Sequence, residues 1–311
     1  MNDFWYDISQ LLVIATTILV AAALVAYLIG SLSNRNAVQD AERARVTARS
    51  TGGSVATLDR EPANPAATAR RAHGAMWYAE KLNQLGLIAL TFSLIARAIV
   101  TGHGPFTNQY EFAVSFAWGI IAAYIYFEWR YRVRLLAIVV LPVALALLLY
   151  ADTLDASVKP LIPALQNNFL LTLHVATAMI AYGAAAVSFG AAVLYLLHPT
   201  LTRGPLARLT PRRELFDELG YRAAVFSYPF LTVMIVLGAI WADIAWGRYW
   251  SWDPKETAAL VTWLIYGAYL HARVSRGWRG DRSAWLLIVA FIAVMLTYFG
   301  NLFFGGLHAY A

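Results

Sequence analysis

The 311-residue sequence contains no cysteine and few charged residues. The lack of cysteine excludes disulfides, thiolate metal ligands, iron–sulfur clusters and a cysteine nucleophile. Charged residues make up 14% of the chain and hydrophobic residues 60%, and the mean hydropathy of +0.56 is far above that of a soluble domain. The composition indicates an integral membrane protein, in which any metal must be held by the six histidines.

The first ten residues contain no Lys or Arg, whereas a signal peptide begins with a basic region, so we expect the first apolar run to remain as a span. About 20 apolar residues cross the bilayer core as a helix. Eight runs approach this length, at residues 8–32, 82–101, 112–128, 135–151, 169–197, 224–243, 257–272 and 284–304. The predicted fold is an all-α, polytopic membrane protein with about eight transmembrane helices. We divide it into a first helix (1–32), a flexible or partly helical cytoplasmic linker (33–81) and a seven-helix membrane domain (82–311).

Basic residues predict the orientation of these spans. Of the 24 Lys and Arg residues, 20 lie in the four loops that follow the odd-numbered spans, whereas Lys159, Arg248 and Lys255 lie in the opposite loops. Because cytoplasmic loops are enriched in Lys and Arg, we expect both termini to lie outside. The net charge of +6 is then a topology signal spread over four loops, and we expect no nucleic-acid partner.

The stretch Trp246–Glu256, between spans six and seven, combines four large aromatic rings with four charged groups on the predicted outer side. Five of the eleven tryptophans lie between positions 241 and 263. Aromatic residues gather at bilayer interfaces in any case, which accounts for part of this cluster. The rings of Tyr249, Trp250 and Trp252 also predict a flat apolar shelf with cationic rims, suited to a planar aromatic anion; the rims are Arg248 and Lys255.

The end of this stretch, Asp253-Pro254-Lys255-Glu256, has the residue order of a helix start. Asp is a favoured N-cap, Pro is tolerated at the first helical position, and Glu at the third position can bond back to the cap. These residues therefore begin the next helix, contact a ligand, or do both.

Two histidines are predicted to share the outer face with this stretch. His174 lies about 9 Å below the outer surface in span five, and His308 follows span eight. Two imidazoles beside an aromatic shelf can form a bis-histidine haem site, because haem iron takes two axial nitrogens and its macrocycle takes flat apolar walls. Taken singly, His174 could pack between helices and His308 could lie in water; together with the shelf they favour ligation.

Two other ionisable residues fall within predicted spans, where such groups are costly. His271 lies on span seven, about 22 Å from Glu256 and near the cytoplasmic side, and is either functional or extends to the interface beside Arg273. Arg97 lies about one turn below the outer surface, and either extends to that surface or meets a ligand carboxylate.

The stretch Trp246–Glu256, followed by Trp263, Tyr266 and Leu270-His271-Ala272-Arg273, closely resembles the WWD signature of haem-handling cytochrome c biogenesis proteins. Eight spans, a single WWD loop at 243–258 and about 300 residues resemble the CcsA (ResC) type of System II, for which the name CcsB is also used. Segments Gly102–Phe112 and Gly306–Tyr310 share the resemblance. One departure is Tyr249, which replaces the first Trp of the paired tryptophans.

The resemblance implies that haem b is bound, with His174 and His308 as the outer axial ligands. It implies an inner haem site at His271, whose second ligand belongs to a CcsB/ResB-type membrane subunit. It further implies haem contacts from five residues of the WWD loop: Trp246, Tyr249, Trp250, Trp252 and Asp253. Three cations are implied to contact the haem propionates: Arg248, Lys255 and Arg97.

The implied function is that of a subunit of a haem lyase, or holocytochrome c synthase. It would carry haem b outward and present it for thioether attachment to the Cys-x-x-Cys-His motif of apocytochrome c, without a side chain acting as acid or base. Implied partners are the CcsB/ResB-type subunit, apocytochrome c, a thioredoxin-like thiol reductase and the lipid bilayer. The expected location is the bacterial cytoplasmic membrane, or alternatively the thylakoid.

The residues leave two other functions open. A b-type electron-transfer subunit would also use bis-histidine haem, although it usually pairs histidines at matched depths. A transporter of another aromatic anion would use the shelf and its cationic rim without iron.

Overall fold

The computed structural model describes the backbone of residues 2–50, 65–161, 165–166, 168–203, 207, 210–300 and 303–308, and their side chains except at 2, 32–50, 65–73 and 168. These residues form α-helices and one short 3-10 helix, and no strand occurs among them. The elements are α1 (Asn2–Ser50), α2 (Pro65–Thr101), α3 (Gln109–Tyr131), η1 (Arg134–Leu136), α4 (Ala137–Asp152), α5 (Asn168–Leu201), α6 (Arg213–Trp246), α7 (Pro254–Ser275) and α8 (Asp281–Phe299).

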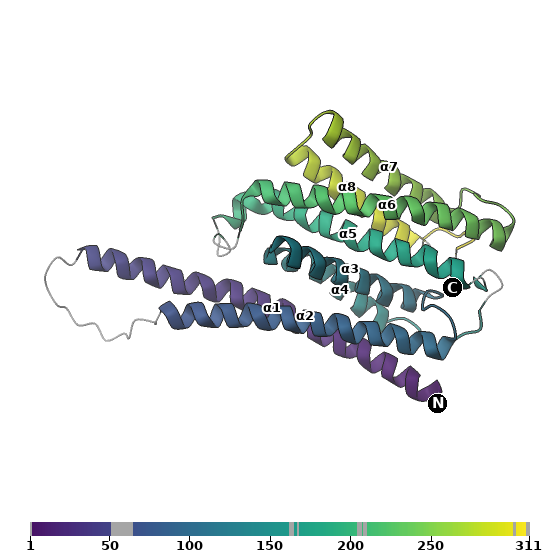
Figure 1. Ribbon diagram of the computed structural model, residues 1–311, viewed down its shortest axis with the longest axis horizontal. Coiled ribbons are helices and arrows are strands. Elements are labelled where there is room, and N and C mark those ends of the chain that lie inside the picture. Colours follow the sequence, from purple (N-terminus) through teal and green to yellow (C-terminus); the bar gives the residue numbers. More distant parts are fainter. Residues whose placement is uncertain are drawn as a thin grey trace.

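Seven of these helices are long and apolar enough to cross a membrane, which confirms the predicted all-α, polytopic membrane protein. The candidate spans are Asp3–Ser31, Gly74–Thr101, Gln109–Tyr131, Arg134–Asp152, Phe169–Leu201, Arg213–Trp246 and Asp281–Phe299. The predicted seventh span forms α7, which is not among the seven, since charged residues at its start and His271 and Arg273 near its end shorten its apolar stretch. It nevertheless lies beside α8 (Figure 1).

The segment predicted as a cytoplasmic linker, 33–81, is helical at both ends. Helix α1 continues to Ser50 and α2 begins at Pro65, and residues 51–64 lie outside the described residues. The two helices lie side by side and extend well beyond the rest of the bundle (Figure 1).

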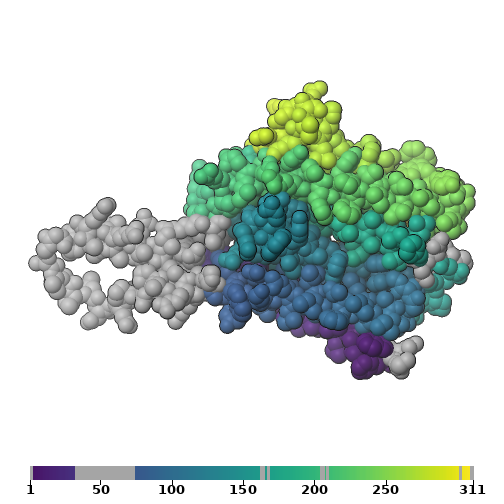
Figure 2. All heavy atoms as spheres, viewed as in Figure 1, coloured from purple at the N-terminus to yellow at the C-terminus, as the bar shows by residue number. Residues whose placement is uncertain are grey.

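Successive helical pairs stack in chain order, from α1–α2 through α3–α4 and α5–α6 to α7–α8 (Figure 1). Figure 2 shows the C-terminal helices at the edge of the molecule opposite the N-terminal pair. Helices α3 and α5 approach closely at two glycines: a Cβ on Gly119 would lie 2.6 Å from the carbonyl oxygen of Met179, and one on Gly183 would collide with the carbonyl oxygen of Gly119. Close approach of this kind requires small residues. It lets Phe116 of α3 stack on Tyr182 of α5, with ring centroids 5.3 Å apart.

One end of the bundle gathers several segments that are distant in sequence. The start of α1, the start of α5, the α6–α7 connection and the segment after α8 all lie at this end (Figure 1). We call it the WWD end, since it carries Trp246–Glu256. The C-terminal ends of α3, α5 and α7 lie at the opposite end, and many of the basic residues follow them in the sequence.

Candidate functional site: a histidine pair in an aromatic cavity

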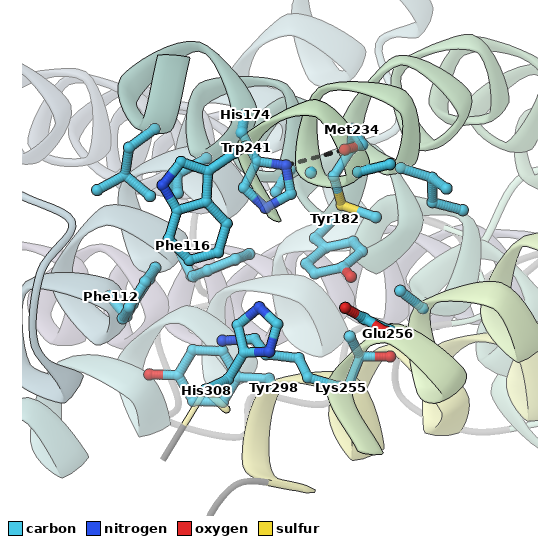
Figure 3. Close-up of a pocket in the computed structure, with 18 of the residues that line it drawn as sticks. Phe112, Phe116, His174, Tyr182, Met234, Trp241, Lys255, Glu256, Tyr298 and His308 are labelled. Carbon is cyan, nitrogen blue, oxygen red and sulfur yellow. Dashed lines mark hydrogen bonds between the residues drawn. The ribbon is translucent and has the colours of Figure 1, made fainter. Parts of the chain in front are cut away.

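The WWD end contains an open cavity, lined by residues of α3, α5, α6, α7 and α8 and by the α6–α7 connection (Figure 3). Aromatic and aliphatic side chains predominate in the lining, and the polar groups among them include His174, His308, Lys255 and Glu256. A large apolar cavity with a few convergent polar groups is typical of a ligand site.

His174 is held in one orientation by α6. Its Nδ1 lies 2.8 Å from the carbonyl oxygen of Met234. A carbonyl oxygen only accepts hydrogen bonds, so Nδ1 donates and Nε2 carries the lone pair. The neighbouring Gly238 makes room for the ring, because a Cβ there would lie 2.7 Å from His174 Cε1. The sequence of α6 therefore fixes both the position and the tautomer of His174.

His308 is held in a similar way by Asp253. Its Nδ1 lies 2.8 Å from Asp253 Oδ1, and the backbone N–H of Leu307 donates to Oδ2 of the same carboxylate at 2.6 Å. Burial raises the pKa of Asp253, but the hydrogen bond from His308 and the N–H donors of Lys255 and Leu307 outweigh it and lower the pKa to about 2. The ionised carboxylate can only accept, so Nδ1 of His308 donates and Nε2 carries the lone pair.

The charge of the His308 ring follows from its surroundings. Burial lowers the pKa of His308 below its ordinary value, and the neighbouring Asp253 opposes this only in part. The ring is therefore neutral at neutral pH, which is the form that binds a metal. In Figure 3, His174 and His308 face one another across the cavity.

An aromatic wall connects the two histidines. The Trp241 ring is parallel to His174 within 7°, with centroids 6.5 Å apart, and lies 5.8 Å from His308. Trp246 lies 4.7 Å from Trp241 and 4.8 Å from His308. Among the described residues, no hydrogen-bond partner meets the buried Nε1 of Trp241.

These residues fit a haem group. Each histidine donates Nδ1–H to a fixed acceptor and keeps its Nε2 lone pair, which is the usual arrangement of metal-ligating histidines. No group of three or more His, Asp or Glu side chains in the described part of the chain could hold a metal ion. Two histidine nitrogens are too few to hold a bare metal ion. Haem needs only two axial ligands from the protein, together with flat apolar walls.

The predicted capping box at the start of α7 is confirmed. Asp253 is the N-cap and its Oδ1 accepts from the Lys255 N–H at 3.0 Å, while the Glu256 carboxylate accepts from the Asp253 N–H at 3.2 Å. The same carboxylate accepts from the backbone N–H of Ser251 at 2.8 Å, which ties down the loop. Asp253 therefore both begins α7 and positions His308, and this second contact was not predicted.

Gly306 permits the contact between Asp253 and the C-terminal segment. An added Cβ at Gly306 would collide with Asp253 Oδ2. The last described residues of the chain can therefore lie against the start of α7, which brings His308 to the cavity.

The other WWD-loop residues divide into two groups. Tyr249 and Trp250 line the cavity, and so does Lys255, whose Nζ lies 4.9 Å from the centre of the Phe112 ring. Trp252 is 70% exposed, its backbone has a positive φ of 61°, and it does not line the cavity. Arg248 is also exposed and outside the cavity lining. The predicted shelf of three rings is therefore split between the cavity and the surface.

The structure places Arg97 away from the cavity. The side chain is buried, its Nε lies 2.9 Å from Glu111 Oε1, and its Nη1 donates to the carbonyl oxygen of Ala156 at 2.6 Å. Arg97 is not among the lining residues. The sequence analysis predicted a haem propionate as the partner of Arg97 and did not consider Glu111. In the structure, Arg97 joins α2 to α3 and to the segment after α4.

His271 also lies outside the cavity. It is exposed near the C-terminal end of α7, and its Nδ1 lies 3.5 Å from Ser275 Oγ. The structure brings His174 and His308 together, and it keeps His271 apart from both.

Several lining residues were missed by the sequence analysis: Phe112, Phe116, Tyr182, Met234 and Tyr298. A signal was available for one of them. His174, Ala178 and Tyr182 are spaced four residues apart and so share one face of α5, and all three line the cavity.

The fold and site together define a polytopic helical membrane protein with two opposed histidines in an aromatic cavity. A profile described as cytochrome C assembly protein matches residues 106–308. A CcsA protein of Guillardia theta is 36% identical over 250 residues, covering 73% of this chain and 83% of the relative. A CcsA protein of Microcystis aeruginosa is 36% identical over 270 residues, covering 69% and 81%.

The chain belongs to the cytochrome c assembly protein family, which confirms the resemblance drawn from Trp246–Glu256. Among solved structures, the cytochrome c haem lyase CcmF has a similar fold, with a TM-score of 0.59 and 18% identity. The match covers 93% of this chain and 46% of CcmF, so this chain corresponds to about half of that protein.

Proposed function

We propose that this chain is the haem-handling subunit of a System II cytochrome c synthase, and that it holds haem b at the WWD end between His174 and His308. The observation that carries the proposal is the pair of facing imidazoles, each held through Nδ1, in an aromatic cavity. The names of the CcsA relatives and of the CcmF haem lyase support the reaction class.

The chain's own residues position the substrates. His174 and His308 hold the iron, Trp241 and Trp250 form flat walls, and Lys255 offers a cation to a haem carboxylate. Haem held there would supply two vinyl groups for addition of the two cysteine S–H groups of apocytochrome c, an addition that needs no oxidant. Holding the reactants in place is the main catalytic contribution that this site can make.

The remaining components follow the same proposal. The WWD end faces the outside of the bacterial cytoplasmic membrane, where a thioredoxin-like thiol reductase keeps the cysteines of apocytochrome c reduced. His271 is one ligand of an inner haem site, and a CcsB/ResB-type subunit supplies the other. The exposure of His271 on an edge helix supports this, since a partner can reach it.

The test is an absorption spectrum of the full chain purified with its CcsB/ResB-type partner. His174→Gly and His308→Gly should each remove or oxidise the outer haem, and added imidazole should restore the spectrum. His103→Gly is a matched control, because this histidine lies near the WWD end, contacts the carbonyl oxygen of Gly104 and does not line the cavity. Wild-type spectra and normal cytochrome c maturation in both cavity variants would refute the proposal.

A further inference from the structure

A second cavity lies at the end opposite the WWD end. Tyr27 and Ser31 of α1 and Met76 of α2 form one side of it. The other side comes from the α3–α4 connection, α4 and the start of α6, and includes Ile138 and Leu215. The cavity therefore lies between the N-terminal helical pair and the part of the chain that matches the family profile.

Two arginines give this cavity a positive edge. Arg132 and Arg134 line it, and no Asp or Glu is present among its described lining residues. The nearest carboxylates to Arg134 are those of Glu80 and Glu128, each 3.9 Å away, at the outer limit of an ion pair. Arg132 is exposed and has no ion-pair partner in the described part of the chain. Nη1 of Arg134 donates to Met76 Sδ at 3.5 Å, and this thioether is a weak acceptor that a phosphate can replace. Both guanidinium groups thus keep donors available to an anion.

The backbone at Arg132 is a second observation. This residue ends α3 with a φ of 58°, and its N–H donates to the carbonyl oxygen of Glu128. Helices that end in this left-handed conformation usually have glycine there, because a side chain is strained in it. An arginine at this position directs a cation to the cavity edge at the expense of backbone strain.

The two sides of the cavity are held together by a buried contact. The Tyr27 hydroxyl of α1 lies 3.1 and 3.0 Å from the two carboxylate oxygens of Glu128 on α3. This fixes the distance between the helical pair and the bundle, so the cavity has a defined width.

We propose that this cavity binds one anionic phospholipid. The phosphate lies on Arg132 and Arg134, and the acyl chains run along Ile138 and Leu215 towards the bilayer. Cations above apolar walls at the end of membrane-spanning helices match a lipid with a charged headgroup, and basic pockets between such helices are typical headgroup sites. A soluble anion would gain nothing from the apolar side. The bound lipid joins the helical pair to the rest of the bundle, independently of haem.

The experiment is native mass spectrometry of the delipidated full chain in a neutral detergent. It is titrated with phosphatidylglycerol and with phosphatidylcholine of the same acyl chains. One phosphatidylglycerol should bind in clear preference, and the affinity should fall about fivefold for each arginine replaced in Arg132→Gln and Arg134→Gln, a charge effect. Arg279→Gln is the control, because Arg279 is exposed on the α7–α8 connection at the same end and does not line the cavity.

A steric variant separates the cavity from the surface charge. Ile138→Trp keeps both arginines but fills the apolar side, and it should abolish the single preferred lipid. Glycerol phosphate, which has the head without the chains, should not compete. The proposal is overturned by equal binding of the two lipids, by an equal loss in Arg279→Gln, by full binding in Ile138→Trp, or by displacement with glycerol phosphate. Thermal unfolding of each variant without lipid shows whether it is folded.

Discussion

The histidines at the two ends of the bundle differ in their burial and in how their side chains are held. At the WWD end, His174 and His308 are each held through Nδ1 by an acceptor and line the same cavity. Near the other end, His271 is exposed, and its Nδ1 lies 3.5 Å from Ser275 Oγ. A site that orients its ligands in advance can bind haem within one chain, whereas a single exposed imidazole needs a second protein to complete a bis-histidine site. The following predictions test this contrast through haem affinity at the WWD end.

The largest effect is expected from Asp253, which holds His308. Asp253→Ala should weaken haem binding at the WWD end by about 10- to 100-fold, the usual cost of losing a residue that orients a metal ligand. It should also cost about 1 kcal/mol of stability through the lost helix cap. Haem titration and thermal unfolding measure the two effects.

Asp253→Ser separates the two roles of this residue. Serine is a good N-cap, but its single, shorter oxygen cannot reach both Lys255 and His308. The serine variant should keep the helix cap, and so be more stable than the alanine variant, but lose haem affinity as the alanine variant does. If it bound haem normally, Asp253 would be only a helix cap.

A smaller effect is expected from Gly238, which makes room for His174. In Gly238→Ala the new Cβ would lie 2.7 Å from Cε1, so the imidazole must shift. Haem affinity should fall by about tenfold, because ligand geometry is sensitive to displacements below 1 Å. Gly300→Ala is the control, since a Cβ there meets nothing within 4 Å. Equal losses in both variants would contradict the packing argument.

Lys255 and Arg248 test the two parts of the WWD loop. Lys255→Gln should weaken haem binding about fivefold, through loss of one charge near a ligand carboxylate. Arg248→Gln should leave the affinity unchanged, because Arg248 is exposed and outside the cavity. If the Arg248 variant lost more haem affinity than the Lys255 variant in the same titration, the ligand would have to lie on the outer surface of the loop and not in the cavity.

The sequence was sufficient for those features that depend on local pattern. Apolar runs predicted the helices, and the order Asp253-Pro254-Lys255-Glu256 predicted the capping box. Successive spans cross the membrane in alternating directions, and this alone predicted that His174, His308 and the WWD loop lie at one end. These predictions needed only the length and direction of each helix.

Contacts between distant segments were not predictable in this way. His308 and Asp253 are 55 residues apart, and the chain between α8 and His308 has no periodicity that would direct it to α7. The Arg97–Glu111 pair depends on how α2 and α3 pack, which the hydrophobic pattern does not determine. The rings of Phe116 and Tyr182 meet because two glycines let α3 and α5 approach. A glycine in the sequence does not show which helix will pack against it.

The smallest effect is expected from His271, and it completes the contrast between the two ends. In the chain purified without a partner, His271→Ala should leave haem affinity and the spectrum at the WWD end unchanged, because the residue lies outside that cavity. In the complex with a CcsB/ResB-type subunit, the same variant should lose one haem of two, since the inner site then lacks a ligand. Loss of the haem held by His174 and His308 in the chain alone would show that the two ends are not independent. Retention of both haems in the complex would remove His271 from the inner site and leave the cavity at the WWD end as this chain's own contribution.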